Sequence, residues 1–215
     1  MPACRSKVAK EGEVDPVYRL LKSWILDCRL PPGGFLAEEE LARECHTSRT
    51  PVREACNRLS QEKWIQRIPN KGHVIPPISI REIVEMYEYR KLLECFTADR
   101  AAKQASSAEL TRLKEIIEVE NQPGLDMAGF LRANEEFHLA LAEVARNQRI
   151  YDHLKLTLEY VHRLDTLSTQ GSSYPIPEHR EIVRAIEARN AAEASQAMAA
   201  HIDMSRDRML KLFGS

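Results

Sequence analysis

The 215-residue sequence lacks the features of a membrane-embedded or secreted protein. No apolar run approaches the roughly 20 residues that a membrane-spanning helix requires. The N-terminal segment MPACRSKVAKEGE contains basic side chains, but no apolar segment follows them, so a secretory signal is not expected. The five cysteines are odd in number and form no C-x-x-C pair, which favours a reducing compartment. We therefore expect a cytoplasmic protein that makes no membrane contact.

The sequence also lacks the short motifs of common enzyme classes. It contains no Gly-rich phosphate loop and no nucleophile elbow, and beyond residue 78 no segment alternates like a strand. The composition, with 43% apolar and 29% charged residues, is that of an ordinary globular protein. The length suits one large or two modest domains. The net charge is only −1, so any basic surface has to be local.

Residues 41–75 combine the parts of a winged helix-turn-helix. Four apolar residues recur at the spacing of one helix face: Val52, Ala55, Cys56 and Leu59. A shorter helix is predicted at 38–45, and His46 and Thr47 remain as a tight connection between the two helices. The β-favouring runs 65–68 and 73–75, joined by Pro-Asn-Lys-Gly, predict a hairpin.

The predicted recognition helix carries basic residues on its other face. Arg49, Arg53 and Asn57 lie at i, i+4 and i+8, so they point away from the apolar stripe. Between residues 43 and 72 there are seven Lys or Arg against three Glu, a local excess that suits phosphate contacts. Two arginines one turn apart can reach guanine or the DNA backbone. The alternative is that they are merely a solvated helix face.

The segment TSRTPVREACNRLSQEKWIQRIPNKGHVI resembles the DNA-binding signature of the GntR family of bacterial transcription regulators. It departs from that pattern at Cys56, where Leu is usual, and at Lys63-Trp64, where Gly is common. Glu39 stands where some members place a DNA-contacting Arg, so that contact is not carried over. The resemblance implies DNA contacts from the recognition helix and the wing, by Ser48, Arg49, Thr50, Arg53, Lys71, Gly72 and His73.

A domain boundary is predicted near Pro77, because the two prolines after the wing continue neither a strand ladder nor a helix. Residues 1–77 are the predicted DNA-binding domain, with a flexible arm at 1–12 and a helix at 14–28. Residues 78–215 are predicted to form an all-helical domain for effector and metal binding and dimerisation. Its expected helices are 79–105, 107–120, 126–146, 150–169, 178–189 and 191–213, with a loop at 171–177. The predicted fold is mainly α: a winged helix-turn-helix followed by a helical bundle.

Three histidines of the helical domain stand at related positions. His138 follows Asn134 by one turn on the same helix. His179 and His201 lie 11 residues before and after Asn190, the expected turn between the last two helices. If those helices are antiparallel, both imidazoles stand about 16 Å from the turn, at one level. Their convergence with His138 would make a divalent metal site, with an oxygen of Asn134 as a further ligand and positions left open. The alternative is three ordinary hydrogen-bonded histidines.

The segments IVEMYEYRKLLECFTADRAA, ANEEFHLALAEVARNQ and EHREIVRAIEARNAAEASQAMAAHI resemble the ligand-binding domain of the FadR branch of GntR regulators, over residues 79–212. Metal-binding members of that branch use Asp-x-x-x-His and two further histidines. The resemblance thus implies a metal held by Asn134, His138, His179 and His201, with zinc expected first and nickel, manganese or iron as alternatives. Asn134 replaces the Asp, and a neutral amide is a weaker ligand than a carboxylate.

In such members a small carboxylate effector binds beside the metal and pairs with an arginine. Arg90, in the matching YEYR segment, is the candidate, although an exposed or intrahelical ion pair with Glu94 at i+4 explains it equally well. His153 and His162 remain unassigned.

Three functions compete on this reading. The first is a transcription regulator, a repressor that binds a pseudo-palindromic operator DNA as a homodimer and is controlled by a small organic acid. The second is the same regulator with a metal-free effector pocket. The third is a metalloenzyme, since a three-histidine site with open positions can activate water. Glu135 and Glu136 point away from the Asn134 and His138 face, so no general base is placed. We therefore predict no enzyme activity and no catalytic residues.

Overall fold

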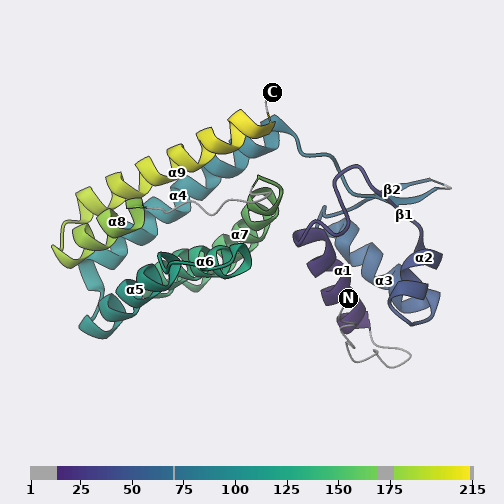
Figure 1. Ribbon diagram of the computed structural model, residues 1–215, viewed down its shortest axis with the longest axis horizontal. Helices are drawn as coiled ribbons and strands as arrows, with labels where there is room; N and C mark the ends of the chain where they lie inside the picture. The colour runs from purple at the N-terminus through teal and green to yellow at the C-terminus, as the bar shows by residue number, and fades with distance from the viewer. Residues whose placement is uncertain (1–13, 70, 169–176, 214–215) are drawn as a thin grey trace. The chain divides into compact units, whose positions relative to one another are not determined.

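The computed structural model describes residues 14–69, 71–168 and 177–213, and divides into two compact units that meet between Ile78 and Ser79 (Figure 1). The predicted arm at 1–12 lies outside the described residues, and so does the predicted loop at 171–177 except for Pro177. Each unit has its own hydrophobic core and is described by itself.

The first unit is three helices and a small antiparallel sheet (Figure 1). Its elements are α1 (Val14–Leu26), β1 (Phe35–Leu36), α2 (Glu38–Glu44), α3 (Arg49–Gln61), β2 (Gln66–Ile68) and β3 (Gly72–Val74). The strand order is β1-β3-β2, so β3 pairs with both neighbours. Strand β1 was not predicted, because two residues are too short to show an alternating pattern.

The core of the first unit is the predicted apolar stripe of α3. Val52, Ala55 and Cys56 are fully buried, and Trp24 and Trp64 are buried as well. Gly72 begins β3 with φ +96°, and a Cβ there would lie 2.7 Å from the carbonyl oxygen of Leu36. The close approach of β1 to the wing therefore requires glycine at this position.

The described part of the second unit contains helices and no strand, which with the first unit confirms the predicted fold class. Its helices are α4 (Ile80–Gln104), α5 (Ser107–Glu120), α6 (Met127–Val144), α7 (Gln148–Ser168), α8 (Pro177–Glu187) and α9 (Ala191–Phe213). Helices α4, α8 and α9 lie side by side in one layer, and α5, α6 and α7 form another (Figure 1). No helix of the described segments is long and apolar enough to cross a membrane.

Local sequence explains where the helices of this unit begin. Ser106 and Glu109 form a reciprocal capping box at the start of α5, and Asp126 accepts a hydrogen bond from the backbone of Gly129 at the start of α6. The capped helices meet around an apolar core that includes Phe137 and Leu141 of α6. Within this apolar surrounding, a group of buried polar side chains stands out.

Candidate functional site

Three histidines converge inside the helical unit. His138 of α6, His179 of α8 and His201 of α9 are at most 2% exposed, and one ring nitrogen of each lies within 4.8 Å of the others. The Nε2 atoms of His179 and His201 are 3.4 Å apart. The structure thus brings together the two histidines that were expected at one level, because α8 and α9 pack against each other on either side of Asn190.

Buried carboxylates orient two of the three imidazoles. The Nδ1 of His179 donates to Oε2 of Glu120, at 2.9 Å, so its Nε2 faces the cluster as an acceptor. The Nδ1 of His138 contacts the carboxylate of Glu94, which is fully buried. Carboxylates that hold the second nitrogen of a ligating histidine are the usual support of a metal site.

Two of the three imidazoles have a lowered pKa. Burial and the neighbouring Arg90 lower the pKa of His138 well below its ordinary value. Burial, together with the two other histidines, does the same to the pKa of His201, whose buried Nδ1 has no hydrogen-bond partner among the described residues. Unprotonated imidazoles can donate a lone pair to a cation, whereas imidazolium ions cannot.

The geometry of the cluster fits a divalent metal ion. Two nitrogens bound tetrahedrally at 2.0–2.1 Å from one ion lie roughly 3.3 Å apart, and the Nε2 atoms of His179 and His201 are 3.4 Å apart. The three histidines come from three different helices, and two of them are supported by carboxylates. The residues present can therefore hold an ion such as zinc.

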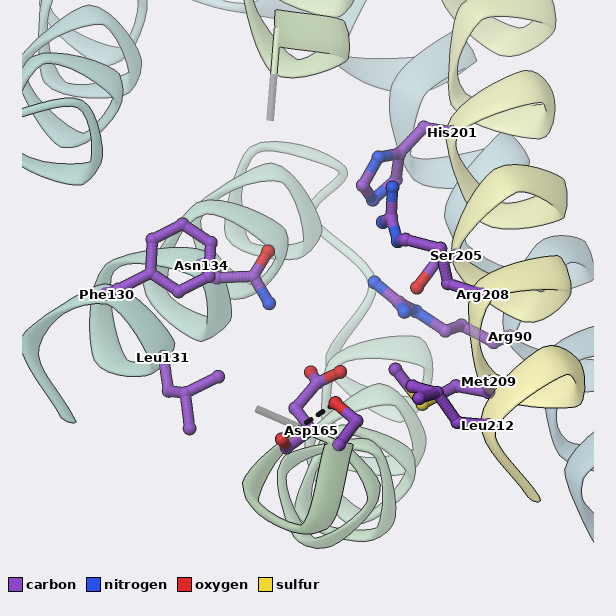
Figure 2. A pocket seen from close by; sticks show the side chains of 11 residues that line it. Arg90, Phe130, Leu131, Asn134, Asp165, His201, Ser205, Arg208, Met209 and Leu212 are labelled. Carbon is purple, nitrogen blue, oxygen red and sulfur yellow. Dashed lines mark hydrogen bonds between the residues drawn. The ribbon is translucent and has the colours of Figure 1, made fainter. Parts of the chain in front are cut away.

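A cavity of about 60 Å³ adjoins the histidines (Figure 2). Asn134 and Asp165 point into it from α6 and α7, and Arg90 of α4 and His201 of α9 border it. The other residues that line it are Phe130, Leu131, Ser168, Ser205, Arg208, Met209 and Leu212. The cavity combines charged groups of both signs with an apolar wall, which suits a small organic ligand with a charged end.

Arg90 is 1% exposed, and its charge is balanced inside the protein. Its Nε donates to the Glu94 carboxylate, and its Nη2 lies 2.8 Å from Nε2 of His138. The alternative expected for Arg90, an intrahelical pair with Glu94, is therefore present, but in buried form. Burial raises the pKa of Glu94, an effect that Arg90 partly offsets.

Sequence reasoning missed four polar members of this site: Glu94 as a partner of His138, Glu120, Asp165 and Arg208. A signal existed for three of them. Glu120 continues the buried stripe of α5 four residues after Ile116, so a carboxylate occupies a core position. Arg208 follows His201 by seven residues and thus shares its face of α9. Asp165 follows the buried Leu158 by seven residues and Val161 by four, so it too continues an apolar stripe, that of α7.

The predicted DNA-contacting residues of the helix-turn-helix lie mostly at the surface. Ser48, Arg49, Thr50 and Arg53 are all exposed at the start of α3. Neither Arg49 nor Arg53 forms an ion pair with a described residue. Arg58, farther along the same helix, stacks 3.8 Å from the Tyr18 ring and pairs with Asp15 at 3.0 Å. The two N-terminal arginines are thus free to meet phosphate or bases.

The wing gives a mixed result. Lys71 is exposed and Gly72 is partly exposed, as DNA contacts require. His73, however, is 3% exposed, and both of its ring nitrogens are buried without a hydrogen-bond partner among the described residues. Burial also lowers its pKa, so the ring is neutral. The predicted contact through the His73 side chain does not fit this arrangement, because the pairing of β3 with both neighbouring strands turns the side chain inward.

A winged helix-turn-helix followed by a helical domain is the architecture of a DNA-binding regulator. Comparison with protein families gives the same class. Residues 14–75 match the bacterial regulatory proteins of the gntR family, and residues 85–204 match the FCD domain. The chain belongs to the GntR family of bacterial regulatory proteins and carries an FCD domain. It is a transcriptional regulator and not an enzyme, as the sequence predicted.

The similarity to known regulators extends over most of the length of both proteins. The Nta operon transcriptional regulator of Aminobacter aminovorans is 28% identical over 182 residues, which cover 84% of this chain and 87% of that protein. The HTH-type transcriptional repressor RspR of Escherichia coli (strain K12) is 28% identical over 193 residues, covering 86% and 84%. Among solved structures, E. coli McbR/YncC is similar in fold, with a TM-score of 0.78 and 20% identity over 93% of this chain and 98% of that one.

Proposed function

We propose that the protein represses transcription by binding a pseudo-palindromic operator as a homodimer, and that a small organic acid controls it from the helical domain, at or near a divalent metal. In this proposal residues 1–77 bind DNA and residues 78–215 bind the effector, the metal and the second subunit. The protein would act in the cytoplasm, where the operator is, and would belong to the FadR branch of the family. The proposed DNA contacts are Ser48, Arg49, Thr50, Arg53, Lys71 and the backbone at Gly72 and His73.

The observation that carries the proposal is the cluster of three buried imidazoles beside a cavity that also contains an arginine. His138, His179 and His201 would hold the ion, with Asn134 as the oxygen ligand from the cavity side. A bound ion supplies a Lewis-acid centre that attracts a carboxylate. Arg90 borders the same cavity, and its guanidinium can pair with a carboxylate bidentately. These groups together favour an acid over a neutral or cationic effector.

An exposed apolar row supports the homodimer. Tyr89, Leu92 and Phe96 recur on the outer face of α4 and are 39%, 74% and 41% exposed. Leu156 of the neighbouring helix α7 is 57% exposed, and the Tyr89 ring contacts that of His153 on α7. A row that spans two helices is larger than scattered surface residues and favours a protein interface. A two-fold partner would cover the same row on both subunits.

Regulation requires that the acid bind one state of the dimer better than another, because a ligand with equal affinity for both shifts nothing. We propose that the DNA-binding state and the acid-bound state differ in this way. A dimer with two equivalent recognition helices then predicts an operator of two half-sites related by two-fold symmetry.

The test begins with metal content. Protein purified without an affinity tag should contain about one zinc, nickel, manganese or iron ion per chain, and His179→Ala should lose it. His153→Ala is the matched control, because His153 is exposed on α7 and its ring contacts Tyr89 rather than the cluster. Wild-type protein without metal, even after soaking with divalent ions, would remove the metal and leave the metal-free effector pocket as the function of the cavity.

The second part of the test concerns DNA. Fragments selected by the wild-type protein from a random pool should contain an inverted repeat, and small organic acids should release the holo protein from them. Fragments without symmetry, or binding that no acid changes, would contradict the proposed operator or the proposed effector respectively.

A further inference from the structure

Arg90, Glu94 and His138 form one buried cluster that links α4 to α6. The Glu94 carboxylate contacts both Nε of Arg90 and Nδ1 of His138, and Arg90 Nη2 lies 2.8 Å from Nε2 of His138. All three side chains are at most 1% exposed. Because a guanidinium only donates hydrogen bonds, the Nε2 of His138 is the acceptor, and the proton of the neutral ring lies on Nδ1.

This arrangement conflicts with a metal ion at the same histidine. With Nδ1 held by Glu94, the only lone pair that His138 offers to an ion is the one on Nε2. That lone pair already accepts from Arg90. In addition, a guanidinium within hydrogen-bond distance of Nε2 would repel a divalent cation at close range in this buried site. Arg90 and the ion cannot occupy Nε2 together.

We propose that Arg90 competes with the metal for His138: it holds Nε2 while the ion is absent and turns into the adjoining cavity when the ion binds. The proposal rests on the metal site proposed above and adds its control element. Occupancy by the ion then decides whether the guanidinium faces a histidine or faces the space that an anionic effector would enter. Asn134 replaces the carboxylate ligand expected in related sites, so the ion has less charge compensation with which to displace Arg90.

The cavity provides a destination for the displaced guanidinium. Arg90 already forms part of its wall, and the carboxylate of Asp165 points into it from α7 (Figure 2). Burial raises the pKa of Asp165 to about 6, and Arg90 is the first of the charges that oppose this rise. The two groups therefore interact electrostatically across the cavity. The Asp165 carboxylate would be a second partner for the guanidinium of Arg90, and this lowers the free-energy cost of its leaving His138. A purely apolar wall would not lower that cost.

The test is a Zn²⁺ titration against a chromophoric chelator, on full-length wild type, Arg90→Met and Arg208→Met. Both arginines line the cavity, so each variant removes one positive charge from the same surroundings, but only Arg90 contacts His138. Arg90→Met should bind Zn²⁺ at least about tenfold more tightly, the lower bound for losing one competing charge-assisted hydrogen bond. Arg208→Met should differ from wild type by less than about threefold.

A second pair of proteins tests the destination. Asp165→Asn should weaken Zn²⁺ binding in the wild-type background, because the displaced guanidinium loses its partner. Asp165→Asn should not change Zn²⁺ binding in the Arg90→Met background, because that protein has no Arg90 guanidinium to pair with the Asp165 carboxylate. An equal effect in both backgrounds would overturn the movement of Arg90 into the cavity.

The outcomes separate this inference from the metal site itself. Zn²⁺ binding that needs His179 but is no tighter in Arg90→Met overturns the competition and leaves the metal site intact. An equal gain in both arginine variants reduces the effect to general charge and also overturns it. No binding in any variant removes the metal site and this inference together, whereas binding by Arg90→Met alone supports the competition. Should Arg90→Met fail to fold, Arg90→Lys replaces it, with a smaller gain expected because one ammonium does not span Glu94 and His138.

Discussion

Glu120 is the residue whose role is simplest to test, because it touches the proposed metal site through one histidine. Its carboxylate accepts from Nδ1 of His179 and so directs Nε2 into the cluster. Glu120→Gln should lower the Zn²⁺ affinity by about 10- to 100-fold, the usual effect of losing such a support. Glu118→Gln on the same helix is the control, since Glu118 is exposed and, among the described residues, pairs with Arg180 alone. Equal affinities for the two variants would show that Glu120 does not orient His179.

Asp165 gives a pH-dependent prediction. Its pKa is raised by burial to about 6 in the folded protein, above the ordinary 3.8 of the unfolded chain. Well below pH 3.8 both states hold the proton, so the carboxyl has no effect on stability. As the pH rises from 3.8 towards 6, the unfolded chain loses the proton first, so the folded state is increasingly destabilised. Above pH 6 both states become ionised, and the destabilisation stays constant.

Asp165→Asn removes this destabilisation. Without metal, the variant should be more stable than wild type by about 3 kcal/mol at pH 7.5, and by only about 0.5 kcal/mol at pH 4. Thermal unfolding at a series of pH values measures the difference, with exposed Asp152→Asn on the same helix as the control. A difference that does not change between pH 4 and pH 7.5 would mean that Asp165 is ordinarily solvated.

At the scale of the element, sequence predicts what is local. The helices of the second unit can be predicted from apolar stripes such as Leu113, Ile116 and Ile117, because each stripe lies within the sequence of one helix. The meeting of His179 and His201 was also within reach, because a short turn at Asn190 joins their two helices and fixes their relative level. The recognition helix shows the same locality, since its buried and exposed faces are both encoded within residues 49–61.

Contacts between distant helices could not be predicted in this way. Helix α4 buries Arg90 and Glu94 while it exposes Leu92 and Phe96, so its apolar residues alone do not show which face is inside. The contact between Arg90 and His138 joins residues 48 apart in sequence and depends on how α4 rotates against α6. That rotation depends on how the helices pack together, so it cannot be predicted from the apolar pattern of one helix.

The two kinds of arginine on α3 lead to opposite expectations. Arg53→Ala removes an exposed charge that pairs with no described residue, and it should weaken operator binding by about 1–3 kcal/mol with unchanged stability. Arg58→Ala removes the stacking on Tyr18 and the ion pair with Asp15, so it should lower the stability by about 1 kcal/mol and affect DNA affinity little. Titrations on selected operator DNA and thermal melts separate the two. Arg53→Ala that melts early but binds DNA normally would reverse the assignment.

For the molecule as a whole, the deciding question is whether the outer face of α4 joins two subunits. A two-fold axis would bring this face against its own copy in the second subunit. A charge introduced near the axis is therefore present twice, and the two like charges repel each other in an interface from which water is excluded. Leu92 is the most exposed member of the row, at 74%, and its side chain is not needed for the core of the subunit. Leu92→Asp should therefore dissociate the dimer while each subunit remains folded.

Sedimentation at micromolar concentration measures this directly, with Val119→Asp as the control. Val119 is apolar and 43% exposed but lies on α5, away from the row. The monomeric Leu92→Asp protein should keep its affinity for a DNA fragment with one half-site and lose the gain that wild type obtains from two, because that gain comes only from linking two recognition helices. A Leu92→Asp protein that remains dimeric would move the interface away from α4. A monomeric variant that still prefers two half-sites would instead mean that subunits associate on DNA through another surface.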